Sequence, residues 1–184
     1  MAGGARKADA ETSVPVSTCF APLSNPSARL LVLGSLPGQM SLAQQQYYAQ
    51  PQNAFWRIMG RLFGAGPELS YADRSQRLVA SGIAVWDVCA SARRPGSLDA
   101  SIIAASVAPN DFGAFFERHA HIQMIAFNGA TAAGLYARLV QRRLPESVRS
   151  IRAVRLPSTS PAHAALSLDA KFAAWRRALC CALD

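Results

Sequence analysis

The sequence predicts an α/β fold of three layers, α/β/α, in which helices cover both faces of a central, mainly parallel four-stranded sheet. The first observation behind this prediction is that four apolar runs alternate with segments of helical periodicity, which is typical of parallel strands joined by helices. The second is that 51% of the 184 residues are hydrophobic, which suffices for a full core and argues against a disordered chain. The four runs span residues 28–35, 83–90, 121–129 and 150–164, and the last continues into a Ser/Thr/Pro loop.

The segments between these runs place apolar residues three and four positions apart, as amphipathic helices do. The clearest of them begins near Asn53 and stops near Gly64 or Gly66. Asn110 or Asp111 can cap another, whose apolar face is made of phenylalanines. Further helices are predicted over residues 71–82, from 110 or 111 to about 120, over 131–143 and over about 169–183.

Residues 1–27 are predicted to form a flexible N-terminal tail, and residues 28–184 a single domain. We see neither a secretory signal nor an apolar run near the roughly 18 residues of a membrane span. We therefore expect a soluble, cytoplasmic protein, nucleoid-associated if bacterial, that is a monomer and has no membrane partner. The four cysteines form no CxxC pair, so neither a metal site nor a cofactor is expected.

The chain is strongly basic, with 19 Lys and Arg against 11 Asp and Glu and a net charge of +8. Such an excess favours a polyanion, such as a nucleic acid, as the partner. A basic but unspecialised surface would explain the same charge, so charge alone leaves both interpretations open.

Glycine and polar residues follow each apolar run, at the edge where ligands bind to parallel sheets. We expect these four segments to converge on one crevice; they are Gly34–Gly38, the residues from Asp87 onward, Asn128–Gly129 and Ser158–Pro161.

Each segment also has a purely structural interpretation. The turn G-S-L-P-G lacks the residues of a phosphate-binding P-loop, a nucleophile elbow or a dinucleotide fingerprint, and could simply end a strand. The Asn128 amide suits the edge of a nucleobase, or it could cap the next helix. Hydroxyls of the S-T-S-P loop could bind phosphates or cap a helix, and His163 could reach DNA or a leaving group or be merely solvated.

Two carboxylates, Asp87 and Asp99, are expected near the crevice, but neither is our first choice as a catalyst. We favour a helix-capping role for Asp99, and Asp87 could anchor Arg93 or Arg94. The two arginines could contact phosphate, although paired arginines more often form a solvated face.

Together these segments resemble the uracil-DNA glycosylase superfamily, and most closely its hypoxanthine-DNA (DNA-deoxyinosine) glycosylase branch. The resemblance covers about residues 28–183. The motifs that carry it are G-S-L-P-G at 34–38, Y-Y-A-Q-P-Q-N-A-F-W at 47–56, F-N-G at 127–129 and S-T-S-P-A at 158–162.

The resemblance implies a monofunctional DNA glycosylase that acts on DNA containing deaminated bases during base excision repair. Such an enzyme flips the damaged nucleotide into a pocket and hydrolyses its N-glycosidic bond, leaving an abasic site. By the same resemblance Asn53 is the catalytic residue, Phe55 stacks on the flipped base, and Asn128 reads the base. The residues implied to bind substrate are Gly34, Ser35, Pro37, Gly38, Tyr48, Phe55, Asn128, Ser158, Ser160 and His163.

Two departures from the uracil-specific members favour hypoxanthine as the lesion, with xanthine or uracil as alternatives. No Asp or Asn stands between Gly34 and Gly38, and Ser158 replaces a frequent histidine. Catalysis then depends on positioning by Asn53, because Asn and Ser do not titrate near pH 7. No lysine is expected near the motifs to form a Schiff base, since Lys7 is in the tail and Lys171 on the last helix. The alternatives are a non-catalytic nucleic-acid-binding module on the same fold and a hydrolase of free nucleosides.

Overall fold

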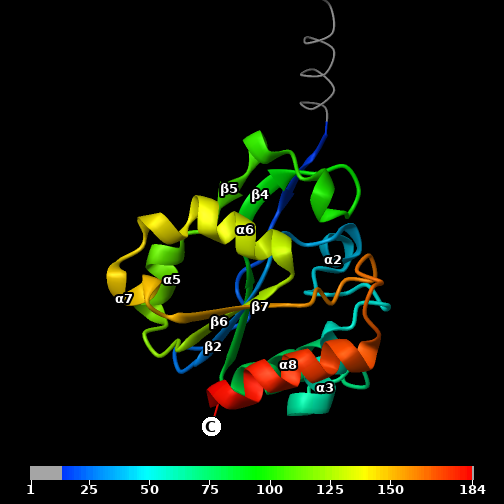
Figure 1. The fold of residues 1–184 in the computed structure, drawn as a ribbon. Helices are drawn as coiled ribbons and strands as arrows, with labels where there is room; N and C mark the ends of the chain where they lie inside the picture. The colour runs from blue at the N-terminus through cyan, green and yellow to red at the C-terminus, as the bar shows by residue number, and fades with distance from the viewer. Residues whose placement is uncertain (1–13, 184) are drawn as a thin grey trace, which may run out of the picture.

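The computed structural model describes residues 14–183 and contains the predicted three-layer α/β/α architecture (Figure 1). Its central sheet has four parallel strands in the order β3-β2-β6-β7. They are β2 (Leu30–Gly34), β3 (Ile83–Asp87), β6 (Met124–Asn128) and β7 (Arg152–Leu156). Every residue of β2, β3 and β6 is buried, which explains why these strands are continuous apolar runs rather than alternating ones.

Helices cover both faces of this sheet. On one face lie α3 (Phe55–Phe63), α4 (Tyr71–Ala80) and α8 (Leu168–Leu183), and α8 packs against β2 and β7 (Figure 1). On the other lie α5 (Phe112–Arg118) and α6 (Ala130–Leu139). Aromatic contacts hold this second layer: Trp86 stacks on Phe115, and Tyr136 packs on Phe127. The short helices α2 (Gln39–Gln44) and α7 (Glu146–Arg149) lie in connections between these elements.

The predicted strand over residues 83–90 is in fact two strands. Strand β3 ends at Asp87, and the chain then enters β4 (Cys89–Arg93), the centre of a second, antiparallel sheet in the order β1-β4-β5. Its other strands are β1 (Val16–Thr18) and β5 (Ala108–Pro109). The prediction failed because Val88 and Cys89 are fully buried, so the apolar run continues from one sheet into the other.

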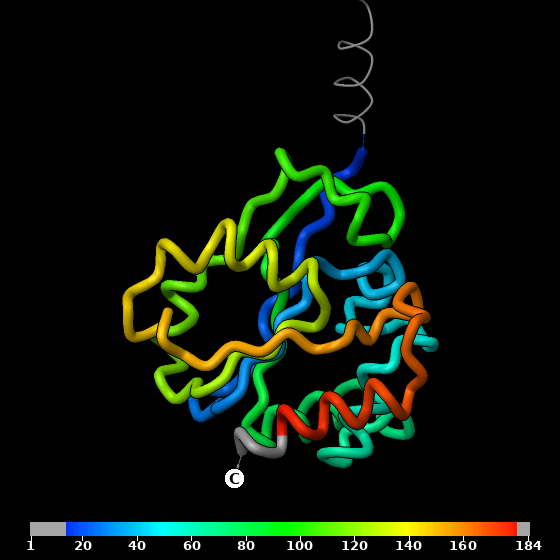
Figure 2. The backbone as a smooth tube through the Cα atoms, in the orientation of Figure 1, coloured from blue at the N-terminus to red at the C-terminus, as the bar shows by residue number. Residues whose placement is uncertain are grey.

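The predicted tail of residues 1–27 is wrong for residues 14–27. Strand β1 pairs with β4, and Leu23 exchanges backbone hydrogen bonds with Val85 of the central sheet. Figure 2 shows this blue segment running from the small sheet toward β2. Residues 1–13 lie outside the described residues, and the single domain over 28–184 stays a prediction. Between residues 14 and 183, no helix has both the length and the apolar character to cross a bilayer.

Candidate active site

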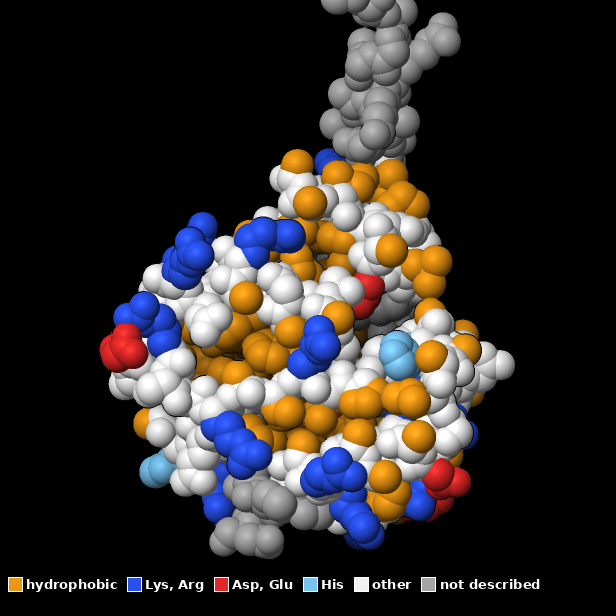
Figure 3. Space-filling model, in the orientation of Figure 1, with side chains coloured by type: hydrophobic (Ala, Val, Ile, Leu, Met, Phe, Trp, Pro, Cys, Tyr) orange, Lys and Arg blue, Asp and Glu red, His pale blue; other side chains and the backbone are white. Residues whose placement is uncertain are grey.

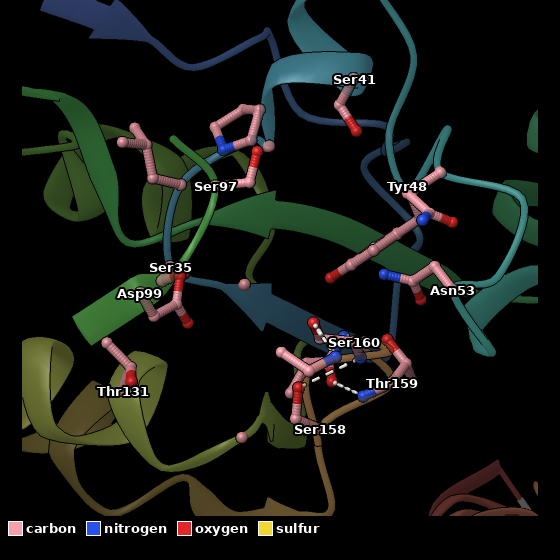
Figure 4. Close-up of a pocket in the computed structure, with 18 of the residues that line it drawn as sticks. Ser35, Ser41, Tyr48, Asn53, Ser97, Asp99, Thr131, Ser158, Thr159 and Ser160 are labelled. Atoms are coloured by element: carbon pink, nitrogen blue, oxygen red, sulfur yellow. Dashed lines mark hydrogen bonds between the residues drawn. The ribbon is translucent and has the colours of Figure 1, made fainter. Parts of the chain in front are cut away.

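The four segments at the carboxyl ends of the strands enclose a cleft of about 730 Å³ (Figure 4). This volume falls within the range of about 300–1,000 Å³ that is typical of ligand sites. In Figure 2 the orange segment after β7 lies beside the cyan segment after β2, and the Ala54 N–H donates to the Thr159 carbonyl at 2.9 Å. The cleft is lined by Asn53, the predicted catalytic residue, and by nine of the ten residues predicted to bind substrate, which are Gly34, Ser35, Pro37, Gly38, Tyr48, Asn128, Ser158, Ser160 and His163.

The floor of the cleft forms where β2 and β3 end side by side. Gly34 pairs with Asp87, and a Cβ at Gly34 would collide with Asp87 Oδ1 and crowd the Tyr48 hydroxyl. Glycine is therefore needed here so that two polar side chains can approach the backbone. The buried Arg94 guanidinium stabilises the turn that follows, because it donates hydrogen bonds to the carbonyls of Leu36 and Pro37.

This position of Arg94 corrects the prediction of a solvated or phosphate-binding arginine pair, since its side chain is only 1% exposed. Burial lowers the pKa of Arg94, whereas the nearby carboxylates Asp99 and Asp87 raise it. Arg94 therefore has a structural role: it joins the first motif to the loop that carries Asp99.

Tyr48, rather than Phe55, presents an aromatic ring to the cleft. Tyr48 has φ of 54°, a left-handed conformation that is uncommon for a bulky residue and is found at functional sites. Phe55 is fully buried and stacks on the Tyr48 ring with the centroids 3.9 Å apart. The prediction that Phe55 stacks on a flipped base is therefore wrong, because Phe55 belongs to the core and supports Tyr48.

Asn53 lies at the wall of the cleft just before α3. Its Oδ1 accepts a hydrogen bond from the Phe55 N–H at 3.0 Å, which fixes the side chain in an Asx turn. Figure 4 shows Asn53 and Tyr48 on one side of the cleft, with Ser35 and Asp99 on the other. Within residues 14–183 the Nδ2 group of Asn53 has no hydrogen-bond partner, so it can donate to a ligand.

Asn128 lines the cleft and also ties two of its loops together. Its Nδ2 donates to Thr159 Oγ1 and its Oδ1 accepts from the Thr159 N–H, each at 2.8 Å (Figure 4). The capping alternative is wrong, because the cap of α6 is Gly129, with φ of 100° and no side-chain hydrogen bond. One N–H of Nδ2 remains for another partner, so base reading by Asn128 stays a prediction.

The Ser158–Pro161 loop is folded by its own hydroxyls. Ser158 Oγ accepts from the Ser160 N–H, and Ser160 Oγ accepts from the Ala162 N–H, both at 3.2 Å. Lys171 is buried behind this loop and donates to the Ser160 carbonyl at 3.2 Å, so it lies closer to the motifs than the sequence predicted. It is nevertheless not among the residues that line the cleft, whereas His163 is.

The two carboxyl groups that the sequence placed near the crevice, Asp87 and Asp99, do line the cleft. Asp99 does not cap a helix: its Oδ1 accepts a 2.6 Å hydrogen bond from Ser35 Oγ and lies 3.7 Å from Arg94 Nη1. Asp87 is only 4% exposed, and its Oδ2 has no hydrogen-bond partner in the structure. Within the described residues it forms no ion pair with Arg94, whose salt bridge is with Asp99.

The electrostatic settings of these two acids differ. Burial, and then the negative charge of Asp99, raise the pKa of Asp87 to about 7, although Arg94 opposes the shift. Burial also raises the pKa of Asp99, while the Ser35 hydrogen bond and Arg94 lower it. The cleft therefore holds one deep carboxyl whose raised pKa favours the protonated form below about pH 7, and a second that has partners for its negative charge.

Both the sequence and the fold are similar to those of a known protein family. The sequence model of the uracil DNA glycosylase superfamily matches residues 21–183. The chain belongs to the uracil DNA glycosylase superfamily. A solution NMR structure described as a candidate uracil DNA glycosylase from Methanosarcina acetivorans superposes with a TM-score of 0.70 at 30% identity, covering 89% of this chain and 98% of the other.

Curated relatives point the same way. A protein named hypoxanthine DNA glycosylase from Methanosarcina barkeri is 32% identical over 111 residues, which are 60% of this chain and 69% of the relative. A protein of the same name from Methanosarcina acetivorans is 34% identical over 114 residues, which are 61% and 71% of the two chains. The chain is therefore an enzyme, a DNA glycosylase.

The surface around the cleft of this glycosylase suits a DNA substrate. On the face in Figure 3, Lys and Arg side chains (blue) are spread over the part formed by α6, α7 and α8, beside a hollow where an acidic side chain (red) shows. Arg155 borders a smaller hollow that also contacts Ser158 and His163. The exposed arginines in the region from α6 to α8 include Arg138, Arg142, Arg143, Arg152, Arg155, Arg176 and Arg177.

Proposed function

We propose that this glycosylase removes hypoxanthine from DNA and leaves an abasic site without cutting the strand, as a step of base excision repair. The observation that carries the proposal is the cleft itself, with Asn53 at its wall. Its floor holds the Tyr48 hydroxyl and Asp87 Oδ2, neither of which has a hydrogen-bond partner in the part of the chain that the structure describes. The names of the two curated relatives support hypoxanthine as the substrate.

The polar floor suits a base with a carbonyl beside a ring N–H. A phenol hydroxyl can donate to a carbonyl oxygen, and a carboxyl group, whether protonated or ionised, has an oxygen that can accept from an N–H. Hypoxanthine, xanthine and uracil all present such an edge, because deamination replaces an amino group by a carbonyl. A base inside the stacked duplex cannot reach this floor, so the nucleotide must be flipped out of the DNA.

The side chains of the cleft favour hydrolysis by water over a covalent intermediate. Lys171 is buried behind the Ser158–Pro161 loop, with Nζ bound to the Ser160 carbonyl, and it is absent from the cleft lining. An amine held in this way is poorly placed to attack a sugar carbon. The reaction would therefore pass through a sugar with oxocarbenium-like positive charge, which preorganised polar groups such as the Asn53 amide stabilise.

The test is base release from otherwise identical duplexes that contain deoxyinosine, deoxyxanthosine or deoxyuridine. We expect the wild type to release hypoxanthine fastest, and Asn53→Ala to lower that rate by about 10²–10³-fold, the usual cost of removing one preorganised donor. Gln123→Ala is the matched control, because Gln123 is an exposed amide at the opposite, amino-terminal edge of the sheet.

The outcomes separate the parts of the proposal. Absence of base release from every duplex by the wild type would overturn it. Uracil release faster than hypoxanthine release would overturn the substrate assignment. If Asn53→Ala releases hypoxanthine at the wild-type rate, Asn53 takes no part in catalysis.

A further inference from the structure

The first motif of this chain lacks an acid, but the fold brings one to it from another segment. Asp99 begins the short 3-10 helix η1 (Asp99–Ser101), far from Ser35 in sequence. The Ser35 hydroxyl donates to Asp99 Oδ1 at 2.6 Å, within the range of a charge-assisted O–H···O hydrogen bond. A carboxylate therefore lies at the first turn although the turn itself, from Gly34 to Gly38, contains none.

The segment that carries Asp99 is fixed to the turn by several contacts. Arg94 binds the carbonyls of Leu36 and Pro37 at one end and that of Gly96 at the other. In addition, the Gln39 N–H donates to Ser97 Oγ at 3.0 Å. These contacts hold the Asp99 side chain in place before a substrate arrives, as preorganised catalysis requires.

Depth distinguishes Asp99 from the other acid of the cleft. The Asp99 side chain is 39% exposed, whereas Asp87 as a whole is 4% exposed. A nucleotide flipped from DNA enters the cleft base first, so its base meets the floor and its sugar stays near the mouth. Asp87 then lies at the depth of the base, and Asp99 lies at the depth of the sugar, across the cleft from Asn53 (Figure 4).

We propose that Asp99 is the catalytic carboxylate that takes the proton of the attacking water, in place of the acid that the first motif lacks. This inference rests on the proposed function. As the bond between the base nitrogen and C1′ breaks, its electron pair leaves with the base, and the water oxygen forms the new bond to C1′. One water proton passes to Asp99 and then, directly or through solvent, to the departing base, so that the abasic sugar and the neutral base are the products.

The charged groups that face Asp99 are consistent with this role. Arg94 on one side and the Ser35 hydroxyl favour its ionised form, and burial strengthens it as a base by raising its pKa. The other acid, Asp87, has its pKa raised to about 7 and is therefore a weaker competitor for ionisation below that pH. The ionised Asp99 also places a negative charge beside the sugar carbon that becomes positive.

The experiment measures single-turnover release of hypoxanthine from deoxyinosine DNA by the wild type, Asp99→Asn and Asp99→Ala. We expect Asp99→Asn, which keeps the size and an acceptor oxygen, to be slower by about 10²–10⁴-fold, the usual contribution of a general base. Added formate should restore part of the rate to Asp99→Ala, because it supplies a small carboxylate. Asp169→Asn is the control: it removes an exposed carboxylate outside the cleft lining.

Lesion-DNA binding and the urea midpoint of unfolding are measured for the same variants. Slow excision by Asp99→Asn with unchanged binding and midpoint, together with formate rescue of Asp99→Ala, supports the inference. Excision by Asp99→Asn at the wild-type rate overturns the inference about Asp99 and leaves the proposed function standing. A slow rate that is explained by a lower unfolding midpoint or by weaker DNA binding has the same consequence. Absence of excision by the wild type overturns both.

Discussion

Replacing Asn128 by alanine should weaken the fold and the reaction together, because this amide joins the third and fourth segments of the cleft. The substitution removes two 2.8 Å hydrogen bonds with Thr159, a residue that is only 1% exposed. Each bond contributes about 1 kcal/mol, and the Thr159 N–H left buried without a partner costs about 1–3 kcal/mol more. We therefore expect the free energy of unfolding to fall by about 3–5 kcal/mol, and excision to slow by up to about 10²-fold as the loop shifts.

Urea unfolding of Asn128→Ala, Thr159→Val and the double variant is the assay. Thr159→Val removes one of the two bonds and should cost about 1–2 kcal/mol. Because the two residues contact each other, the double variant should lose less than the sum of the single losses, by about 1 kcal/mol. Asn53→Ala is the comparison, since Asn53 holds a single local bond and should cost about 1 kcal/mol or less while affecting activity more. If Asn128→Ala lowers the free energy of unfolding by less than about 0.5 kcal/mol, or if the losses of the two single variants simply add in the double variant, Asn128 does not join the two segments as described.

Two further predictions concern pH and salt. The pKa of Asp87 is raised from 3.8 to about 7, so its protonated form stabilises the fold fully below about pH 4, and this contribution is lost as the pH rises toward 7. Asp87→Asn cannot ionise, so its stability relative to the wild type should rise between about pH 4 and 8, by about 1.4 kcal/mol per unit of pKa shift. Urea unfolding across that range measures it, and a constant difference would contradict the reasoning. For binding, contacts between the exposed arginines and about four phosphates predict that affinity for lesion duplex falls about 10²-fold from about 50 to 200 mM salt. Fluorescence anisotropy titrations measure this fall, and an affinity that stays flat would count against the basic surface as the DNA-binding face.

The sequence predicted the central sheet well because burial on both faces leaves a distinct pattern. The runs that became β2 and β6 are apolar at nearly every position and end at Gly34 and Asn128, after which the loops begin. The same pattern failed at Val88 and Cys89, which are as apolar as β3 but belong to the connection and the second sheet. An apolar run predicts that its residues are buried, but it does not indicate to which sheet they belong.

The candidate site was predicted where its residues adjoin a strand end and missed where distant segments meet. Asp87 and Asp99 were both expected near the crevice, and both line it. The contact of Asp99 with Ser35 could not be predicted, since it spans 64 positions and depends on the path that Arg94 imposes on the loop. Phe55 was misassigned because the helical periodicity that predicts α3 also places this side chain in the core, where it supports Tyr48.

The pairing of residues 14–27 with both sheets decides where the chain can be shortened or fused to another protein. The Phe20 carbonyl accepts hydrogen bonds from Trp86 Nε1 at 3.1 Å and from the Tyr47 hydroxyl at 3.3 Å. A version that starts at residue 28 would leave both of these aromatic side chains without that acceptor, and Tyr47 is part of the cleft lining. A cleavage site or fusion joint therefore belongs before residue 14, because from there on the amino-terminal segment is part of the enzyme that holds the cleft.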